Sequence, residues 1–210
     1  MSGFPSRDVS GSWFRAHVNH GGPDRGCWWF SSAGANPDES GRFDLPAPEG
    51  TCYFASTEEA AARERVGTQL RKTAGRESVL ASVLATANGP VVVTEVTMSA
   101  VKTANLPVRK ADRWVNRSLW VGTGIYRISQ GWAALWRAAG FEGLLYEPRF
   151  TGGARVRALA VFGAAGRPKP ARPTKDSKSL EEVLTAHGVR VVWPPGSAPA
   201  LSSTAPPPPL

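Results

Sequence analysis

The chain has 210 residues, a length that suits one domain with a tail better than two domains. Hydrophobic residues make up 41% of it, enough for a sizeable core, and 25 Lys and Arg against 17 Asp and Glu give a net charge of +8. This charge favours an anionic partner, whether a phosphate-bearing small molecule, a nucleic acid or an acidic protein.

Cysteine content and hydropathy exclude several further classes. The two cysteines, Cys27 and Cys52, are too few for a disulfide framework or a metal cluster. No segment reaches the roughly 18 apolar residues of a membrane span, and the N-terminal residues lack the apolar core of a signal peptide. We therefore expect a soluble, metal-free protein of the reducing cytoplasm, with no membrane partner.

Strands and helices are both predicted in the first half of the chain. A capping box of Ser56 and Glu59 predicts a helix that starts there and runs to about Thr73. The other expected elements are a flexible N-terminus over 1–11, strands over 12–18, 51–55 and 91–98, a second helix over 77–87, and a basic irregular segment over 102–118.

The second half continues the mixed pattern. Trp132, Leu135 and Trp136 form the apolar stripe of an amphipathic helix predicted over 128–139. The remaining expected elements are a strand over 141–146, a central strand over 155–162, a basic linker over 167–178, a capped helix over 179–186, a strand over 189–193 and a disordered Pro-rich tail over 194–210. Strands and helices without strict alternation predict an α+β fold, with the main domain over 12–166 and the basic linker, short helix and last strand over 167–193.

Glu64 is the first candidate for a functional side chain. On the predicted helix, Ala60 and Ala61 precede it by one turn, and Gly67 and Thr68 follow it by one turn. Because residues three and four apart share a helix face, Glu64 projects from a patch of small side chains. This clearing suits a carboxylate that lines a ligand pocket, although most glutamates on helices are simply solvated.

Several motifs, taken in order, resemble one known family. They are Arg15 within WFRAH, then GRFDLP, GTCYFAS, AAARERVG, and the longer segment IYRISQGWAALWRAAGFEGLLYEPRF. Together they span roughly residues 12–163 and resemble the RES domain family, the toxins of bacterial RES–Xre toxin–antitoxin pairs. The resemblance implies an ADP-ribosyltransferase-like fold in a single domain. It also implies cleavage of NAD at the nicotinamide–ribose bond by hydrolysis or phosphorolysis, and neutralisation by an Xre-type antitoxin.

The family takes its name from a dispersed Arg, Glu and Ser. The Arg corresponds to Arg15 or Arg42 and the Glu to Glu64, but Pro148 stands where the Tyr-x-Ser pattern of the family would place the serine. Proline has neither a hydroxyl nor an amide hydrogen. Either a neighbour such as Arg149 takes over the role of the serine, or the activity is altered.

The chemistry of NAD cleavage gives these side chains expected roles. Glu64 would stabilise the positive charge that develops on the ribose, as glycosidase carboxylates do. Arg15 and Arg42, together with Arg149, would bind NAD, because a guanidinium matches a pyrophosphate bidentately. Tyr53 would stack on the nicotinamide, so we expect Glu64, Arg42 and Tyr53 to form the catalytic group and no metal to take part.

Two other functions remain open at the level of sequence. The same fold could transfer ADP-ribose to a macromolecule, or a degenerate domain could only bind an anionic partner. The segment 149–178 carries eight Lys and Arg and one Asp, but no nucleic-acid-binding motif accompanies it. We interpret it as a solvated face or a docking surface for an acidic antitoxin, with nucleic acid bound only through that antitoxin.

Overall fold

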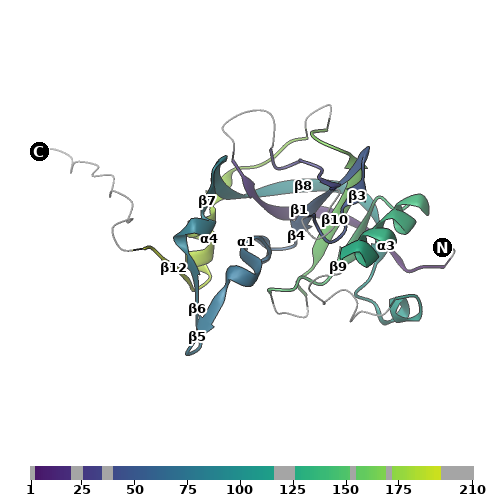
Figure 1. Ribbon diagram of the computed structural model, residues 1–210. Helices are drawn as coiled ribbons and strands as arrows, with labels where there is room; N and C mark the ends of the chain where they lie inside the picture. Colours follow the sequence, from purple (N-terminus) through teal and green to yellow (C-terminus); the bar gives the residue numbers. More distant parts are fainter. Residues whose placement is uncertain are drawn as a thin grey trace, which may run out of the picture.

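Two long antiparallel strands, β1 (Ser6–Val18) and β8 (Gly89–Asn105), pair from the start of β1 to its end and form the spine of the molecule (Figure 1). The computed structural model describes residues 3–19, 26–34, 40–115, 126–151, 155–168 and 172–194. Within these residues, no helix is long and apolar enough to cross a membrane.

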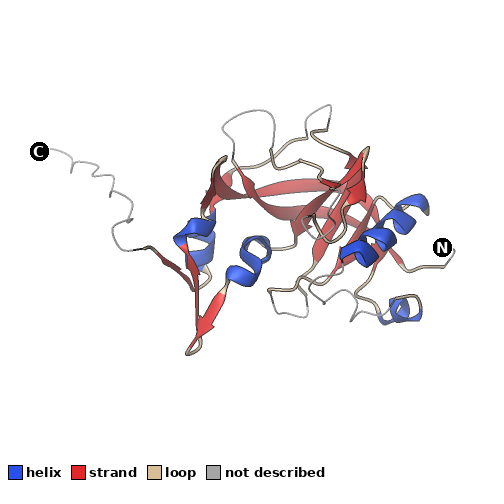
Figure 2. Cartoon of the chain, viewed as in Figure 1, coloured by secondary structure: helices blue, strands red, loops and turns tan. Residues whose placement is uncertain are grey.

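The other elements are short and are arranged around this pair (Figure 2). The further strands are β2 (Ser32–Ala33), β3 (Leu45–Pro46), β4 (Glu49–Ala55), β5 (Arg71–Thr73), β6 (Arg76–Leu80), β7 (Ala85–Thr86), β9 (Gly143–Tyr146), β10 (Ala158–Ala164), β11 (Ser177–Ser179) and β12 (Val189–Val192). The α-helices are α1 (Glu58–Val66), α3 (Tyr126–Ala138) and α4 (Leu180–Ala186), and the 3-10 helices are η2 (Gly67–Gln69), η3 (Ala81–Val83) and η4 (Arg109–Arg113).

The main sheet closes on itself. Its strands follow the order β1-β4-β10-β9-β8-β11, and β8 also pairs with β1, so five of them form a ring. The pair β8–β9 is parallel, whereas the other pairs of the ring are antiparallel. Closure pairs the edges of these strands with one another and gives the sheet an inside and an outside.

Alternate side chains of β10 pack on opposite faces of the sheet. Leu159 and Val161 belong to a buried cluster inside the ring with Trp13, whereas Ala160 and Phe162 belong to a second cluster on the outer face. Successive side chains of a strand point to opposite faces, and a strand that is apolar on both must be covered on both. The prediction of a central, wholly apolar strand in this region is therefore confirmed.

Helix α3 covers the outer face beside β9 and β10, while α1 and α4 pack at the other end of the β1–β8 pair (Figures 1 and 2). Trp136 of α3 is fully buried, and Gly140 ends the helix segment with a φ of +83°. Leu135, which was predicted to share the buried stripe, is 54% exposed, so that part of the prediction is wrong. The cap of α4 is confirmed, because Ser179 Oγ accepts a hydrogen bond from the Glu182 amide at 3.1 Å.

The predicted helix over 77–87 is wrong. Residues Arg76–Leu80 form strand β6, which pairs in parallel with β12 and antiparallel with β5. Val79 is 1% exposed in this small sheet and packs in one cluster with α1 and α4. The apolar residues whose spacing suggested a helix belong in part to a short strand, β6, and its parallel partner β12 is remote in sequence.

Three other boundaries differ from the predictions. The N-terminus was expected to be flexible over 1–11, but β1 begins at Ser6 and buries Val9 against β8. Helix α1 ends at Val66 rather than near Thr73, because Gly67 adopts a φ of +51° and the chain turns into η2 and β5. Its N-cap is Thr57, not Ser56, since the Thr57 hydroxyl accepts from the Ala60 amide.

Two segments expected to be irregular are partly ordered. Strand β8 continues through Asn105, and η4 follows it, within the stretch expected to be irregular over 102–118. The predicted linker over 167–178 contains the start of β11, which pairs with β8. Residues 116–118 and most of the predicted tail over 194–210 lie outside the described residues.

Candidate functional site

The turn of residues 41–44 is held by its own side chains and by β4. The Gly41 amide donates to Asp44 Oδ2 at 2.7 Å, and the Tyr53 hydroxyl donates to Asp44 Oδ1 at 2.8 Å while accepting from the Phe43 amide at 2.8 Å. A Cβ on Gly41 would lie 2.6 Å from both Asp44 Oδ1 and the Tyr53 hydroxyl, so a side chain there would displace the hydrogen-bonded pair. Burial raises the pKa of Asp44, although the bonds from Tyr53 and Gly41 oppose the rise.

Helix α3 holds the same turn from the other side. Ser129 Oγ donates to the Arg42 carbonyl at 2.6 Å, and Gln130 Nε2 donates to the Gly41 carbonyl at 3.0 Å. Because the backbone is fixed on both sides, the Arg42 side chain is held beside the ring of Tyr146, the last residue of β9. Both Ser129 and Gln130 are buried, so these polar contacts are shielded from water.

The Arg42 guanidinium lies under an aromatic ring. Its Cζ is 5.9 Å from the ring centre of Tyr146 and 5.6 Å from that of Phe43. Its Nε is buried and has no hydrogen-bond partner among the described residues. A buried donor without an acceptor is costly, so this nitrogen is suited to an acceptor brought by a ligand.

Glu64 connects helix α1 to the loop after β9. Its Oε1 accepts from the amides of Arg149 and Phe150, at 2.6 and 2.8 Å. Two backbone donors hold the carboxylate in one orientation and also position Arg149, which follows Pro148 in the chain. Ala60 and Ala61 precede Glu64 on α1, as predicted, and Ala61 lines the space in front of it, whereas Gly67 and Thr68 belong to η2, beyond the end of the helix.

These side chains meet in one hollow of about 370 Å³, which we call the arginine cavity. All five residues that the sequence singled out line it: Arg15, Arg42, Tyr53, Glu64 and Arg149. The structure thus brings together residues from β1, β4, α1 and two loops. Their individual roles stay predictions.

Arg15 also ties the cavity to the interior of the ring. Its Nη1 donates to the carbonyls of Cys27 and Trp29, at 2.6 and 2.9 Å, and to Cys52 Sγ. Burial raises the pKa of Cys27 to about 12 and that of Cys52 to about 11, against the opposing charge of Arg15. Both thiols are therefore protonated and inert at neutral pH.

Sequence reasoning missed three polar side chains that line the cavity: Arg65, Tyr126 and Tyr146. Burial, and then the charge of Arg15, lowers the pKa of Arg65, which follows Glu64 directly in the AAARERVG motif. Burial, and then the charge of Glu64, raises the pKa of Tyr146. A signal for Tyr146 existed, because it is the tyrosine of the Tyr-x-Ser pattern in which Pro148 replaces the serine.

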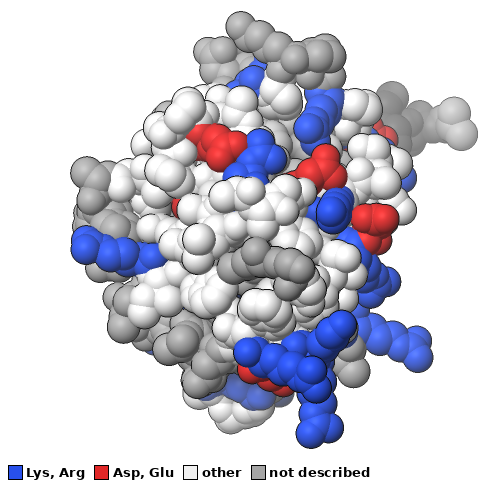
Figure 3. All heavy atoms as spheres, turned by 90° about the vertical axis from the view of Figure 1, so that its right-hand side faces the viewer, with Lys and Arg blue, Asp and Glu red and all other residues white. Residues whose placement is uncertain are grey.

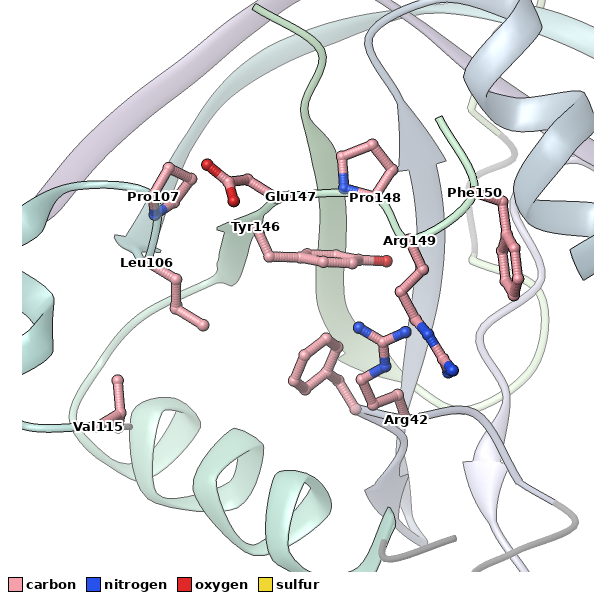
Figure 4. A pocket seen from close by; sticks show the side chains of 10 residues that line it. Arg42, Leu106, Pro107, Val115, Tyr146, Glu147, Pro148, Arg149 and Phe150 are labelled. Carbon is pink, nitrogen blue, oxygen red and sulfur yellow. The ribbon is translucent and has the colours of Figure 1, made fainter. Parts of the chain in front are cut away.

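A second hollow, of about 380 Å³, also has Tyr146 in its wall, and we call it the apolar cavity (Figure 4). It shares Arg42, Tyr146, Arg149 and Phe150 with the arginine cavity. The rest of its wall is formed by Phe43, Leu106, Pro107, Val115, Glu147 and Pro148. The guanidiniums of Arg42 and Arg149 therefore stand at the junction of the two hollows.

The fold and this junction define the class of protein. The described part of the chain is an α+β domain of the ADP-ribosyltransferase-like kind, as predicted. It superposes on the toxin in the crystal structure of the M. tuberculosis MbcT–MbcA toxin–antitoxin complex with a TM-score of 0.51 and 16% sequence identity, over 87% of this chain and 91% of that one.

The chain belongs to the RES domain family, whose model matches residues 12–181. The family predicted from the sequence motifs is therefore confirmed. No curated protein matches the chain. Among the described residues, no group of three or more His, Cys, Asp or Glu side chains is placed to hold a metal ion.

Proposed function

We propose that this RES domain is a toxin-type enzyme that cleaves NAD at its nicotinamide–ribose bond. The observation that carries the proposal is the arginine cavity, where the fixed carboxylate of Glu64 faces the same space as the guanidiniums of Arg42 and Arg149. A carboxylate and paired cations match the two ends of the reaction, which are a developing positive ribose and a pyrophosphate.

The reaction breaks the C–N bond between ribose C1 and nicotinamide. The bonding electrons leave with nicotinamide, whose cationic ring becomes neutral. The new bond to C1 is formed either by the oxygen of water, which releases a proton to the solvent, or by an unprotonated oxygen of phosphate. The products are nicotinamide with ADP-ribose or with ADP-ribose 1-phosphate. Since the leaving group is already good, positioning and electrostatic stabilisation are the main tasks of the protein.

Glu64 is suited to the ribose end because it is already oriented. Oε1 accepts from two amides, so Oε2 is the oxygen that would stabilise the oxocarbenium-like charge. These amides belong to Arg149 and Phe150, so the orientation of Glu64 needs no hydroxyl at position 148. This supports an active enzyme despite Pro148.

Arg42 and Arg149 are suited to the pyrophosphate. The buried Arg42 Nε needs an acceptor, and phosphate oxygens supply several. Arg15 adds positive charge, but the three acceptors of its Nη1 are protein atoms, so part of its guanidinium is already engaged.

The test is nicotinamide release from NAD by the purified chain, freed of any bound partner, with and without phosphate. We expect Glu64→Gln to slow release by about a hundredfold or more while NAD still binds. The control is Asp8→Asn, which makes the same chemical change at an exposed residue of β1 outside both cavities. Undiminished NAD after incubation with wild type would refute the reaction, and a labelled macromolecule would instead indicate ADP-ribosyl transfer.

The partner we propose is an antitoxin of the Xre type that covers the mouth of the arginine cavity. Tyr126 of α3 lines this cavity, and on the same helix Ile128 and Leu135 are 40% and 54% exposed. Figure 3 shows the side of the molecule that carries α3, with a largely uncharged area and Lys, Arg, Asp and Glu side chains around it. An apolar segment of a partner matches the uncharged area, and the net charge of +8 favours an acidic partner. A purified candidate antitoxin should inhibit NAD cleavage, and should fail to do so after Leu135→Asp.

A further inference from the structure

The apolar cavity shares the guanidiniums of Arg42 and Arg149 with the arginine cavity, so a ligand bound by these two arginines can extend into both cavities. Building on the proposed function, we propose that it binds the adenosine half of NAD. We further assign to Glu147 the selection of a free 2′-hydroxyl on the adenosine ribose over a 2′-phosphate. The chain would then act on NAD and reject NADP.

The walls of the apolar cavity suit a purine. Phe43, Leu106 and Val115 are almost fully buried and form an apolar floor, and Tyr146 closes one side with its ring. Ligand sites are mostly apolar hollows of roughly 300 to 1,000 Å³ with few polar groups, and a volume of about 380 Å³ lies within this range. A flat base can be buried there against aromatic and aliphatic carbon.

The charges at the junction fix the direction of the dinucleotide. Arg42 and Arg149 line both hollows, so a pyrophosphate held by them has one half of NAD on each side. Glu64 lines only the arginine cavity, so the ribose to be cleaved lies there. The adenosine half is then directed to the apolar side, and the reverse direction would separate the scissile bond from Glu64.

Glu147 stands at the rim of the apolar cavity. Its side chain is exposed, and Figure 4 shows the carboxylate turned towards Pro107 and away from the guanidiniums of Arg42 and Arg149. Within the described residues, no hydrogen bond or ion pair engages this carboxylate. In doubly wound dinucleotide-binding folds a carboxylate accepts a hydrogen bond from the 2′-hydroxyl of the adenosine ribose, and Glu147 could make the same bond here, whereas a 2′-phosphate would meet like charge.

The test measures binding of ADP-ribose, ADP-ribose 2′-phosphate and ribose 5-phosphate to the full chain by calorimetry at one ionic strength. We expect ADP-ribose to bind tightest, and to be preferred over its 2′-phosphate by about tenfold, because the rim is partly screened by water. Glu147→Gln should bring the two within about twofold, since it keeps the shape but removes the charge. Asp8→Asn should keep the wild-type preference.

These measurements distinguish failure of the adenosine site from failure of the proposed NAD cleavage. ADP-ribose binding no tighter than ribose 5-phosphate would show that the adenosine half has no site, and a preference that survives Glu147→Gln would remove Glu147 as the selector. Absence of NAD cleavage together with the expected preference would contradict the proposed reaction but support the site. Loss of cleavage in Glu147→Gln with unchanged ADP-ribose affinity would indicate that NAD binds in the opposite direction, with the scissile ribose beside Glu147.

Discussion

At the scale of single residues, Tyr53 differs from Glu64 and Arg42, although all three line the arginine cavity. Only Oε1 of Glu64 is engaged by the amides of Arg149 and Phe150, and the buried Arg42 Nε has no acceptor among the described residues. Tyr53 was expected to stack on nicotinamide, yet its hydroxyl bridges the Phe43 amide and Asp44. This geometry favours a positioning role for Tyr53, which sequence alone could not distinguish because both roles require an aromatic ring on β4.

The change Tyr53→Phe tests that role. It removes the donor to Asp44 and the acceptor of the Phe43 amide, and an unpaired buried polar group costs about 1 to 3 kcal/mol, so the free energy of unfolding should fall by that amount. Denaturant unfolding measures the fall. NAD affinity should weaken as the turn that presents Arg42 loosens, while the pH profile of cleavage keeps its shape. A large drop in kcat with unchanged stability and KM would instead identify Tyr53 as a catalytic residue.

At the scale of elements, the sequence predicted helix ends that depend only on neighbouring residues. The serine cap of α4 and the glycine after α3 were readable because capping needs only neighbouring residues. Strand β6 was not readable, because its parallel partner β12 is remote in sequence, and the apolar residues of 77–87 fit a helix equally well. The early end of α1 at Gly67 had a signal, since a glycine with positive φ commonly ends a helix.

Strand β6 is joined to α1 by an ion pair whose contribution should depend on pH. Arg63 donates to Glu77 at 2.7 Å and to Glu59 at 2.8 Å, and the bond to Arg63 lowers the pKa of Glu77 below its ordinary 4.5. A carboxyl with a lowered folded-state pKa stabilises the fold above its ordinary pKa and loses this effect as pH falls through the lowered value. Glu77→Gln should therefore cost about 0.5 kcal/mol at pH 7 and nothing near pH 2.

Denaturant unfolding across this pH range measures the difference between wild type and Glu77→Gln. Asp8→Asn, at an exposed position of β1, is the matched control and should show no such convergence. A destabilisation by Glu77→Gln that is equal at both pH values would mean that packing of the side chain, and not its charge, joins β6 to α1.

At the scale of the whole molecule, the α+β class followed from the mixed order of elements, but closure of the ring did not. The sequence shows a central apolar strand, yet which strands flank it depends on the pairing of β1 with β8 and β4, contacts that no local pattern records. Ring closure is what brings β1, β4 and β9 to one rim, and with them Arg15, Tyr53 and Tyr146. The composition of the site was therefore predictable only through the motifs.

The excess charge of the chain should act on ligand capture over distance. The net charge is +8, and four arginines line the arginine cavity against one glutamate, so an anionic ligand is drawn in before contact. The Debye length falls from about 30 Å at 0.01 M salt to about 8 Å at 0.15 M, which screens this attraction. The association rate of ADP-ribose, followed by tryptophan fluorescence in stopped flow, should fall roughly tenfold over that range while dissociation changes less. Uncharged nicotinamide is the control, and an equal salt effect on its association rate would show that salt changes the protein and not the steering.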